Sequence, residues 1–396
     1  MKLKGIYEKI LPFGILGALC FLFLASLIRF RPGNGSSDLK FTPYTGEIGV
    51  KGILNGSFQE EWGKWFTNNF YGQSMAVSCR NQIKYSLFHD GSGGWICGKD
   101  RYLFSASQVE RYLGRHEEEV ATEEYEKFAS NVSQLQTSLE SAGKKFVYIL
   151  TPNKVEIYPE YLPWYEQIIV RYGVDRKRSA HVRLVEAFDK YGVHYYDTTE
   201  DILRMKEEAD FDAFAKTGHH WTFTACAAEM NAIFSGIGPM TAGIDYPQIN
   251  VVGISDEVCH YDLDILNTQN VLYKHNQDVR YQSPVIEYPK ISDTNVYWFG
   301  TSYGALFTIA MYQGVEERAF DSLTFQQYFT GLFTFNEEGL LAKDFTAEDT
   351  PEDIGVMEHI RDNDLIVMEQ QADSGIYPTH VKFVDYVNQA LLKANQ

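Results

Sequence analysis

The chain has 396 residues, 44% of them hydrophobic, which is enough for one large domain or two average ones with a sizeable core. Its 35 basic and 53 acidic residues give a formal net charge of −18, which would repel a phosphate backbone and argues against a nucleic-acid partner. Five cysteines are too few for a disulfide scaffold, and no Cys or His pair has the spacing of a zinc site, so we expect no metal and no cofactor.

The N-terminal end has the pattern of a membrane anchor. Residues 10–28 contain no charged residue, and their number matches a helix that crosses a hydrocarbon core. A cleaved signal peptide is the alternative, but this apolar run is longer than a usual signal-peptide core, and no small-residue cleavage site follows it. Positive charges flank the run on both sides, so charge alone leaves its orientation open. The short leading segment and the large remainder favour a cytoplasmic N-terminus.

These patterns predict an order of segments along the chain. We expect residues 1–9 in the cytoplasm, a transmembrane anchor over 10–28, a tether over 29–54, a helical and hairpin lead-in over 55–125 and an α/β domain over 126–396. The bulk of the chain would lie outside the cell, held to the cell membrane by a single pass. Four cysteines in this outer part allow three disulfide pairings, among which the sequence does not choose: Cys79, Cys97, Cys226 and Cys259.

The predicted α/β domain is recognised by its alternation of segments. Short apolar runs, of which the clearest are 145–151, 296–299 and 364–369, are separated by charged stretches of helical character. Strands that alternate with helices predict a doubly wound parallel sheet covered by helices on both faces. Ligands of such sheets bind at the carboxyl ends of the strands.

The segment Gly300-Thr301-Ser302-Tyr303-Gly304 lies between a predicted strand and a predicted helix. A serine in such a turn is held exposed, and the backbone N–H groups that open the helix can stabilise a negatively charged oxygen. Ser302 is therefore the candidate nucleophile, and Gly300, Thr301 and Tyr303 form the candidate turn and oxyanion site.

His220 is the candidate base for that serine. It lies in the segment 217–222, immediately before a predicted helix. The structural alternative is a capping segment, in which Thr222 caps the helix and the two neighbouring histidines only form hydrogen bonds.

Five short segments together give the chain a resemblance to the alginate O-acetyltransferase family of SGNH hydrolase-like exported proteins, including its Asp-His-His-Trp relatives. In chain order they are 98–104, 152–160, 220–222, 300–303 and 364–370. The resemblance implies an SGNH-like three-layer α/β/α domain and a Ser-His-Asp triad in which Asp and His precede Ser and the serine carries the acetyl group. It also implies a polysaccharide acceptor and a partner membrane-bound O-acyltransferase that supplies the acetyl group.

One position departs from the family pattern. Where relatives carry Asp two residues before the histidine, this chain has Gly218, which cannot orient an imidazole. Asp210 or Asp212 could replace that acid through loop geometry, or a backbone carbonyl could hold His220 in a Ser-His dyad.

Two further segments have candidate roles. The matched segment 152–160 offers three candidate substrate contacts, Asn153, Lys154 and Tyr158. The acidic segment 260–264 superficially resembles a metal loop, but it has too few oxygen ligands and no glycine turn, so we predict a solvated loop there.

Three functions follow from these observations. The first is a membrane-anchored extracellular O-acetyltransferase, or acetyl-esterase, that acts on a cell-surface or secreted polysaccharide through an acyl-Ser302; the acidic body favours a neutral glycan. The second is a catalytically lapsed glycan-binding or scaffold protein of a polysaccharide export or modification complex, because Gly218 replaces the expected acid. The third is an α/β-hydrolase-type esterase with the chain order Ser302, Asp364, His380.

Overall fold

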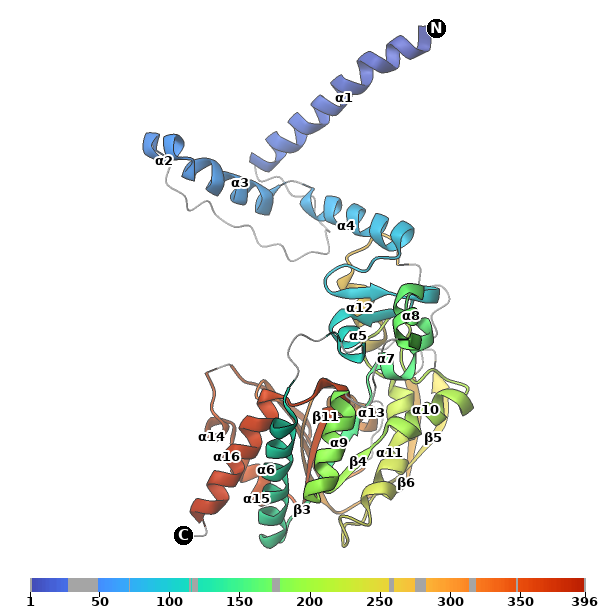
Figure 1. Cartoon of the computed structure of the whole chain (residues 1–396), viewed down its shortest axis with the longest axis vertical. Helices are drawn as coiled ribbons and strands as arrows, with labels where there is room; N and C mark the ends of the chain where they lie inside the picture. Colours follow the sequence, from blue (N-terminus) through green and yellow to red (C-terminus); the bar gives the residue numbers. More distant parts are fainter. Residues whose placement is uncertain are drawn as a thin grey trace. The chain divides into compact units, whose positions relative to one another are not determined.

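The computed structural model describes residues 2–27, 49–70, 72–113, 115, 120–172, 179–255, 260–274, 283–312, 318–346 and 348–394. The chain divides into two compact units (Figure 1). The N-terminal unit comprises Met1–Phe88 and Gln269–Lys274, and the main unit comprises His89–Thr268 and His275–Gln396. Most of the predicted tether lies outside the described residues, as does Cys259.

The N-terminal unit is helical. Its helices are α1 (Lys2–Leu27), α2 (Val50–Asn55), α3 (Ser57–Asn69) and α4 (Gln73–Ile83), the last continued by a π-helical turn over Lys84–Phe88. The segment 269–274 is fastened to α4, where Asn81 Nδ2 donates to the Gln269 carbonyl at 2.9 Å and Ser78 Oγ donates to Asn270 Oδ1 at 2.9 Å. Across the described ranges, no helix combines the length and the apolar character of a membrane span.

A seven-stranded sheet forms the centre of the main unit, in the order β10-β9-β8-β7-β11-β3-β4. Strands β4, β3, β11, β7 and β8 pair in parallel, whereas β9 pairs antiparallel with both β8 and β10. The strands are β3 (Lys145–Thr151), β4 (Tyr195–Asp197), β7 (Asn295–Gly300), β8 (Ser322–Gln327), β9 (Gly331–Asn336), β10 (Gly339–Asp344) and β11 (Leu365–Gln371).

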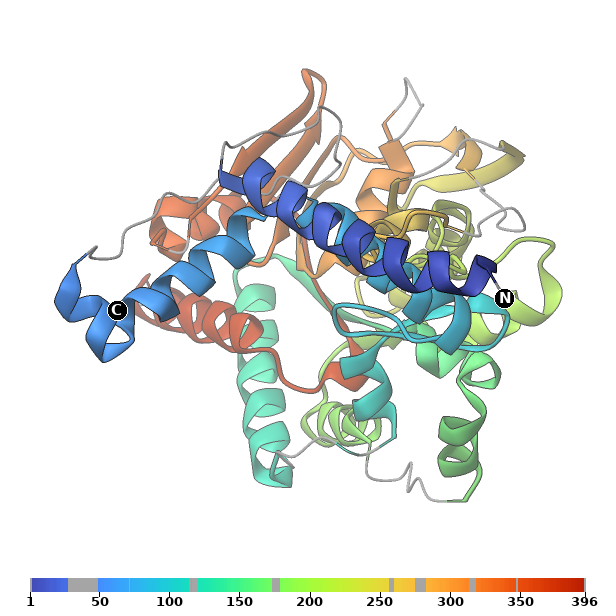
Figure 2. The same ribbon diagram turned by 90° about the horizontal axis from the view of Figure 1, so that it is seen from above.

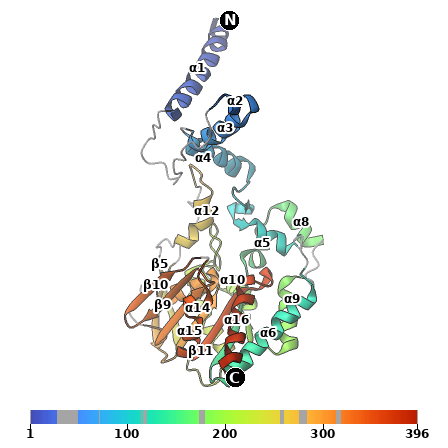
Figure 3. The same ribbon diagram turned by 90° about the vertical axis from the view of Figure 1, so that its left-hand side faces the viewer.

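The expectation of a parallel sheet is therefore wrong for its last two strands. The connections 328–330 and 337–338 are too short for the crossover that parallel neighbours need, so the chain returns as a hairpin. This β9–β10 hairpin, orange-brown in Figure 2, forms one edge of the sheet, and Figure 3 shows it on the side of the main unit opposite α6 and α9.

Helices cover both faces of the sheet, so the three-layer α/β/α prediction is confirmed. One face packs against α6 (Thr122–Ser141), α9 (Ala180–Tyr191), α15 (Val356–Asp362) and α16 (Pro378–Ala394). The other face packs against α10 (Thr199–Glu208), α11 (Phe223–Ile237) and α13 (Ser302–Tyr312). Figure 1 shows α6 and α16 side by side on the first face.

The middle residues of the central strands are continuously apolar because both faces of these strands are buried. In β3, Phe146, Tyr148 and Leu150 belong to the cluster under α6 and α9, whereas Val147 and Ile149 belong to the cluster under α11 and α13. The same alternation holds in β7 and β11. This two-sided burial explains why the sequence shows continuous apolar runs rather than alternating ones.

Smaller elements connect the layers. They are β1 (Trp95–Cys97), β2 (Leu103–Ser105), α5 (Ala106–Tyr112), α7 (Lys154–Ile157), α8 (Trp164–Tyr172), β5 (Gln248–Ser255), α12 (Asp264–Thr268), β6 (Ser283–Lys290) and α14 (Pro351–Ile354). Strands β5 and β6 follow α11 and precede β7 in the sequence, and they pair antiparallel. Helix α12 lies between β5 and β6 in the sequence. Within the described residues, Cys79 and Cys97 form no disulfide.

Candidate active site

Ser302 stands where the sequence predicts, at the junction between a central strand and a helix. Strand β7 ends at Gly300 and α13 begins at Ser302, at the carboxyl end of the parallel part of the sheet. His220 lies just before α11, in a segment joined to itself by the bridge between Phe214 and Trp221.

The cap that the capping alternative predicted at Thr222 is present, and it helps to place His220. Thr222 Oγ1 accepts from the Ala225 N–H at 3.1 Å and donates to the Asp212 carbonyl at 2.8 Å. The cap therefore fixes the entry into α11 two residues after the histidine.

A continuous hydrogen-bond relay joins three side chains. His220 Nε2 lies 2.8 Å from Ser302 Oγ, and His220 Nδ1 lies 2.7 Å from Asp264 Oδ2. A carboxylate can only accept, so Nδ1 carries the proton of the neutral ring and Nε2 is the acceptor that faces the serine hydroxyl. This tautomer can remove a proton from Ser302.

The acid of this relay is not one that the sequence suggested. Asp210 and Asp212 were expected to replace the missing Asp, with a backbone carbonyl as the alternative, but His220 Nδ1 meets Asp264. Asp264 belongs to the segment predicted as a solvated loop, and that prediction was wrong. Asp264 is the first residue of α12 and follows His220 by 44 residues. An Asp in the first turn of a helix is common, so this pattern did not single out Asp264 in the sequence.

Asp264 is itself held by backbone groups. Its Oδ1 accepts from the N–H groups of His219 at 2.7 Å and Ile265 at 2.6 Å, leaving Oδ2 for the imidazole of His220. Burial works against the charge, but the hydrogen bonds from His220 and from the His219 N–H keep the pKa of Asp264 below its usual value. The carboxylate is thus both ionised and fixed in orientation.

The structure leaves no room for a side chain at position 218. A Cβ on Gly218 would lie 2.4 Å from the Tyr261 carbonyl oxygen and 3.2 Å from the Asp262 carbonyl carbon. Thr217 Oγ1 also donates to the Asp262 carbonyl at 2.8 Å. The backbone that delivers Asp264 therefore occupies the space that a side chain at position 218 would need.

The three expected substrate contacts are buried supports instead. Lys154 is 1% exposed, and its Nζ lies 2.6 to 2.9 Å from four carbonyl oxygens, those of Leu103, Ala215, Lys216 and Gly218. Burial lowers the pKa of Lys154 to about 7. This side chain therefore holds the segment that leads into His220, and its burial leaves no surface of it open for a substrate contact.

Asn153 and Tyr158 support the same region. Asn153 is fully buried and caps α7, where its side chain accepts from the Val155 and Glu156 N–H groups. Tyr158 is 5% exposed, and its hydroxyl oxygen accepts from the Ala213 N–H at 3.2 Å.

Another histidine, His181, lies between two carboxylates near β4 and does not contact Ser302. His181 Nε2 is 2.6 Å from Asp197 Oδ2, and Nδ1 is 3.2 Å from Glu156 Oε1. Burial opposes a charge on this ring, but the two carboxylates prevail and raise the pKa of His181 to about 10. His181 is therefore a charged structural link.

The residues of the hydrolase-type alternative do not meet. His380 is fully buried and its Nε2 lies 2.8 Å from the Glu369 carbonyl oxygen. Asp364 Oδ2 accepts from the Asn295 N–H at the start of β7, whereas Ser302 follows the end of that strand. The order Ser302, Asp364, His380 therefore forms no triad.

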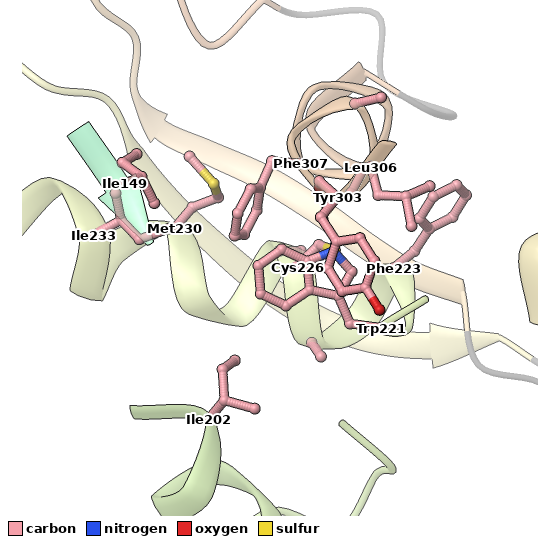
Figure 4. Close-up of a cluster of buried hydrophobic side chains, with 14 of the residues drawn as sticks. Ile149, Ile202, Trp221, Phe223, Cys226, Met230, Ile233, Tyr303, Leu306 and Phe307 are labelled. Atoms are coloured by element: carbon pink, nitrogen blue, oxygen red, sulfur yellow. Dashed lines mark hydrogen bonds between the residues drawn. The ribbon is translucent and has the colours of Figure 1, made fainter. Parts of the chain in front are cut away.

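Buried aromatic side chains pack next to the residues of the relay. Trp221 Nε1 donates to the Tyr303 carbonyl at 3.3 Å, and its ring packs on Phe307 with the centroids 4.2 Å apart. Figure 4 shows these rings gathered between α11 and α13, with Cys226 and Met230 beside them. The segment that carries His220 is thus held against α13, the helix that begins with Ser302.

Comparison with known proteins agrees with the predicted resemblance. Residues 96–241 match the family model described as "SGNH hydrolase-like domain, acetyltransferase AlgX". The "Probable alginate O-acetylase AlgJ" of Pseudomonas syringae pv. tomato is 23% identical over 177 residues, which cover 43% of this chain and 40% of that protein. The protein of the same name from Pseudomonas aeruginosa is 21% identical over 206 residues, which cover 52% and 48%.

These matches confirm the family resemblance, although they span less than half the length of the curated relatives. The region matched by the family model contains His220 and ends before Asp264 and Ser302. Among solved structures, Pseudomonas aeruginosa AlgX superposes with a TM-score of 0.48 and 13% identity, covering 80% of this chain and 71% of that chain.

Proposed function

We propose that this chain, whose residues 96–241 match an SGNH hydrolase-like acetyltransferase domain, transfers acetyl groups to a polysaccharide hydroxyl through an acetyl-Ser302 intermediate. The observation that carries the proposal is the relay from Asp264 through His220 to Ser302, with contacts of 2.7 and 2.8 Å. A serine, a neutral imidazole and a carboxylate in this order are the parts of an activated nucleophile.

The geometry supports a two-step reaction. In the first step Ser302 Oγ attacks the acetyl carbonyl while His220 Nε2 takes the hydroxyl proton, and the imidazolium is stabilised by Asp264. The departing group then receives that proton. In the second step a sugar hydroxyl gives its proton to Nε2 and attacks the acetyl carbonyl; the bond to Ser302 Oγ breaks, and Nε2 returns that proton to Oγ, which restores the serine and the neutral imidazole. Attack by water in place of the sugar would give an esterase.

The partners belong to the proposal as well. The names of the relatives refer to alginate, a polyanion, but a chain with a net charge of −18 would repel such an acceptor, so we favour a neutral glycan. The acetyl group would come from a membrane-bound O-acyltransferase. The reaction would take place at the outer face of the cell membrane, with residues 10–28 as the anchor.

The complete relay favours an enzyme over a lapsed binding or scaffold protein. That alternative depended on the absence of an acid at position 218, and Asp264 fills the role from another segment.

The test is acetylation of the purified full chain by an activated acetyl ester, followed by intact mass and peptide mapping. We expect one acetyl group on the peptide that contains Ser302. The adduct should be absent in Ser302→Ala, and its formation should slow by about 10²- to 10⁴-fold in His220→Asn, because the general base is removed. The control is His380→Asn, a change of another buried histidine, which should acetylate normally. Acetylation of Ser302→Ala at the wild-type rate would refute the proposal.

A further inference from the structure

Glu369 is a buried carboxyl group that the relay does not use. It lies in β11 beside β7, it is fully buried, and among the described residues it forms no ion pair with a basic side chain. A buried carboxyl group without a cation is costly unless hydrogen bonds satisfy it.

Four donors satisfy this carboxylate, and three of them come from the turn that carries the nucleophile. Oε2 accepts from the Thr301 N–H at 2.9 Å, from Thr301 Oγ1 at 2.9 Å and from the Gly304 N–H at 3.0 Å. Oε1 accepts from Thr151 Oγ1 at 2.8 Å. Burial raises the pKa of Glu369, and these hydrogen bonds act in the opposite direction.

The two glycines of the turn are explained by this contact. A Cβ on Gly300 would lie 2.7 Å from Glu369 Oε2, and a Cβ on Gly304 would lie at the same distance from that atom. A side chain at either position would push the turn off the carboxylate. The glycines therefore allow the backbone on both sides of Ser302 to close around one buried acceptor.

The same hydrogen bonds determine which backbone N–H group of this turn remains available to bind a negatively charged oxygen. The N–H groups of Thr301 and Gly304 go to Glu369, the Tyr303 N–H goes to Thr301 Oγ1 at 3.1 Å, and the Ala305 N–H goes to the Thr301 carbonyl at 3.1 Å. In the part of the chain that the structure describes, the N–H of Ser302 has no acceptor in this turn. It lies at the positive end of α13, where a negative oxygen is stabilised.

We propose that Glu369 is the positioning residue of the nucleophile turn: by accepting from Thr301 and Gly304 it fixes the backbone around Ser302 and leaves the Ser302 N–H for the oxyanion. The inference rests on the proposed function. Glu369 does not touch Ser302 or the reacting atoms, so its effect on the reaction passes through the turn.

The test compares Glu369→Gln with a matched pair at its partner, Thr301→Val and Thr301→Ser. Glutamine keeps the size of Glu369 but removes its charge and one of its two acceptor oxygens, and valine keeps the shape of Thr301 but removes its hydroxyl. We expect kcat for acetylation of Ser302 to fall by about 10²-fold or more in Glu369→Gln and Thr301→Val with little change in KM, because oxyanion stabilisation acts on the transition state. Thr301→Ser, which keeps the hydroxyl, should lose much less of kcat than Thr301→Val.

Two further readouts separate positioning from general destabilisation. The pH midpoint of the reaction should not move, because His220 is untouched, and amide hydrogen exchange should accelerate in the peptide containing residues 300–305 of Glu369→Gln. The double variant Glu369→Gln/Thr301→Val should lose a smaller factor in kcat than the product of the two single factors, because both changes break the same hydrogen-bond network. If Glu369→Gln does not fold, the Thr301 pair alone decides.

The proposal is overturned if folded Glu369→Gln, or Thr301→Val where Glu369→Gln is unfolded, retains kcat within about threefold of wild type. Failure of the proposed function would look different, since the wild-type chain itself would then form no acetyl-Ser302. In that case the exchange measurement still tests the turn, and unchanged exchange in Glu369→Gln would refute the positioning role.

Discussion

Replacing Asp264 with asparagine tests the relay at its least expected member. Asparagine retains Oδ1, which can still accept from the His219 and Ile265 N–H groups, so the start of α12 should keep its place. It puts an NH₂ group where Oδ2 now faces His220 Nδ1 at 2.7 Å. Two donors cannot share that contact, so the ring is driven to the tautomer with its proton on Nε2. That tautomer cannot accept the Ser302 proton.

The magnitude follows from this change of tautomer. The equivalent acid-to-amide change in a serine protease triad lowers kcat by about 10⁴-fold, which is about 5 kcal/mol of transition-state stabilisation. We expect a loss of this order in the rate of acetyl-Ser302 formation from an activated acetyl ester, measured by quenched-flow mass spectrometry. The melting temperature should change little.

The controls are the two acids expected from the sequence. Asp210→Asn and Asp212→Asn should retain acetylation within a few-fold of wild type, because neither carboxylate is hydrogen-bonded to His220. The reasoning is refuted if Asp264→Asn keeps its rate within tenfold, or if one of the controls shows the large loss instead.

Three further results are expected. Gly218→Asp should not restore a family-type triad but should lower both the melting temperature and the acetylation rate, because its Cβ would lie 2.4 Å from the Tyr261 carbonyl oxygen; a faster enzyme would contradict this account of the site. Lys154→Met should lower the free energy of unfolding by about 3 kcal/mol or more in urea titrations, because it leaves buried carbonyls without a donor, and an unchanged midpoint would rule out the supporting role. The pKa of His181 is raised from 6.5 to about 10, so its contribution to stability is complete below pH 6.5 and is lost as the pH rises toward 10. Wild type and His181→Gln should therefore differ most in unfolding free energy near pH 6 and least near pH 10, and a constant difference would contradict the charged link.

The sequence by itself determined the features that depend on neighbours along the chain. The largely apolar runs at 145–151, 296–299 and 364–369 predicted buried strands, because a strand covered on both faces has apolar residues at consecutive positions. The glycine-flanked turn at Ser302 and the segment around His220 were found for the same local reason, since a strand-to-helix turn and a helix cap each involve only a few consecutive residues.

Only the tertiary structure decided which distant groups meet. Asp264 reaches His220 across 44 residues, and Lys154 reaches the Gly218 carbonyl across 64, so no local pattern marked either one. A carboxylate or an ammonium looks like a surface group in sequence, because those residues are mostly exposed in folded proteins. Whether such a side chain is solvated, supports a loop or orients a base depends on which backbone folds over it, and that is set by long-range packing.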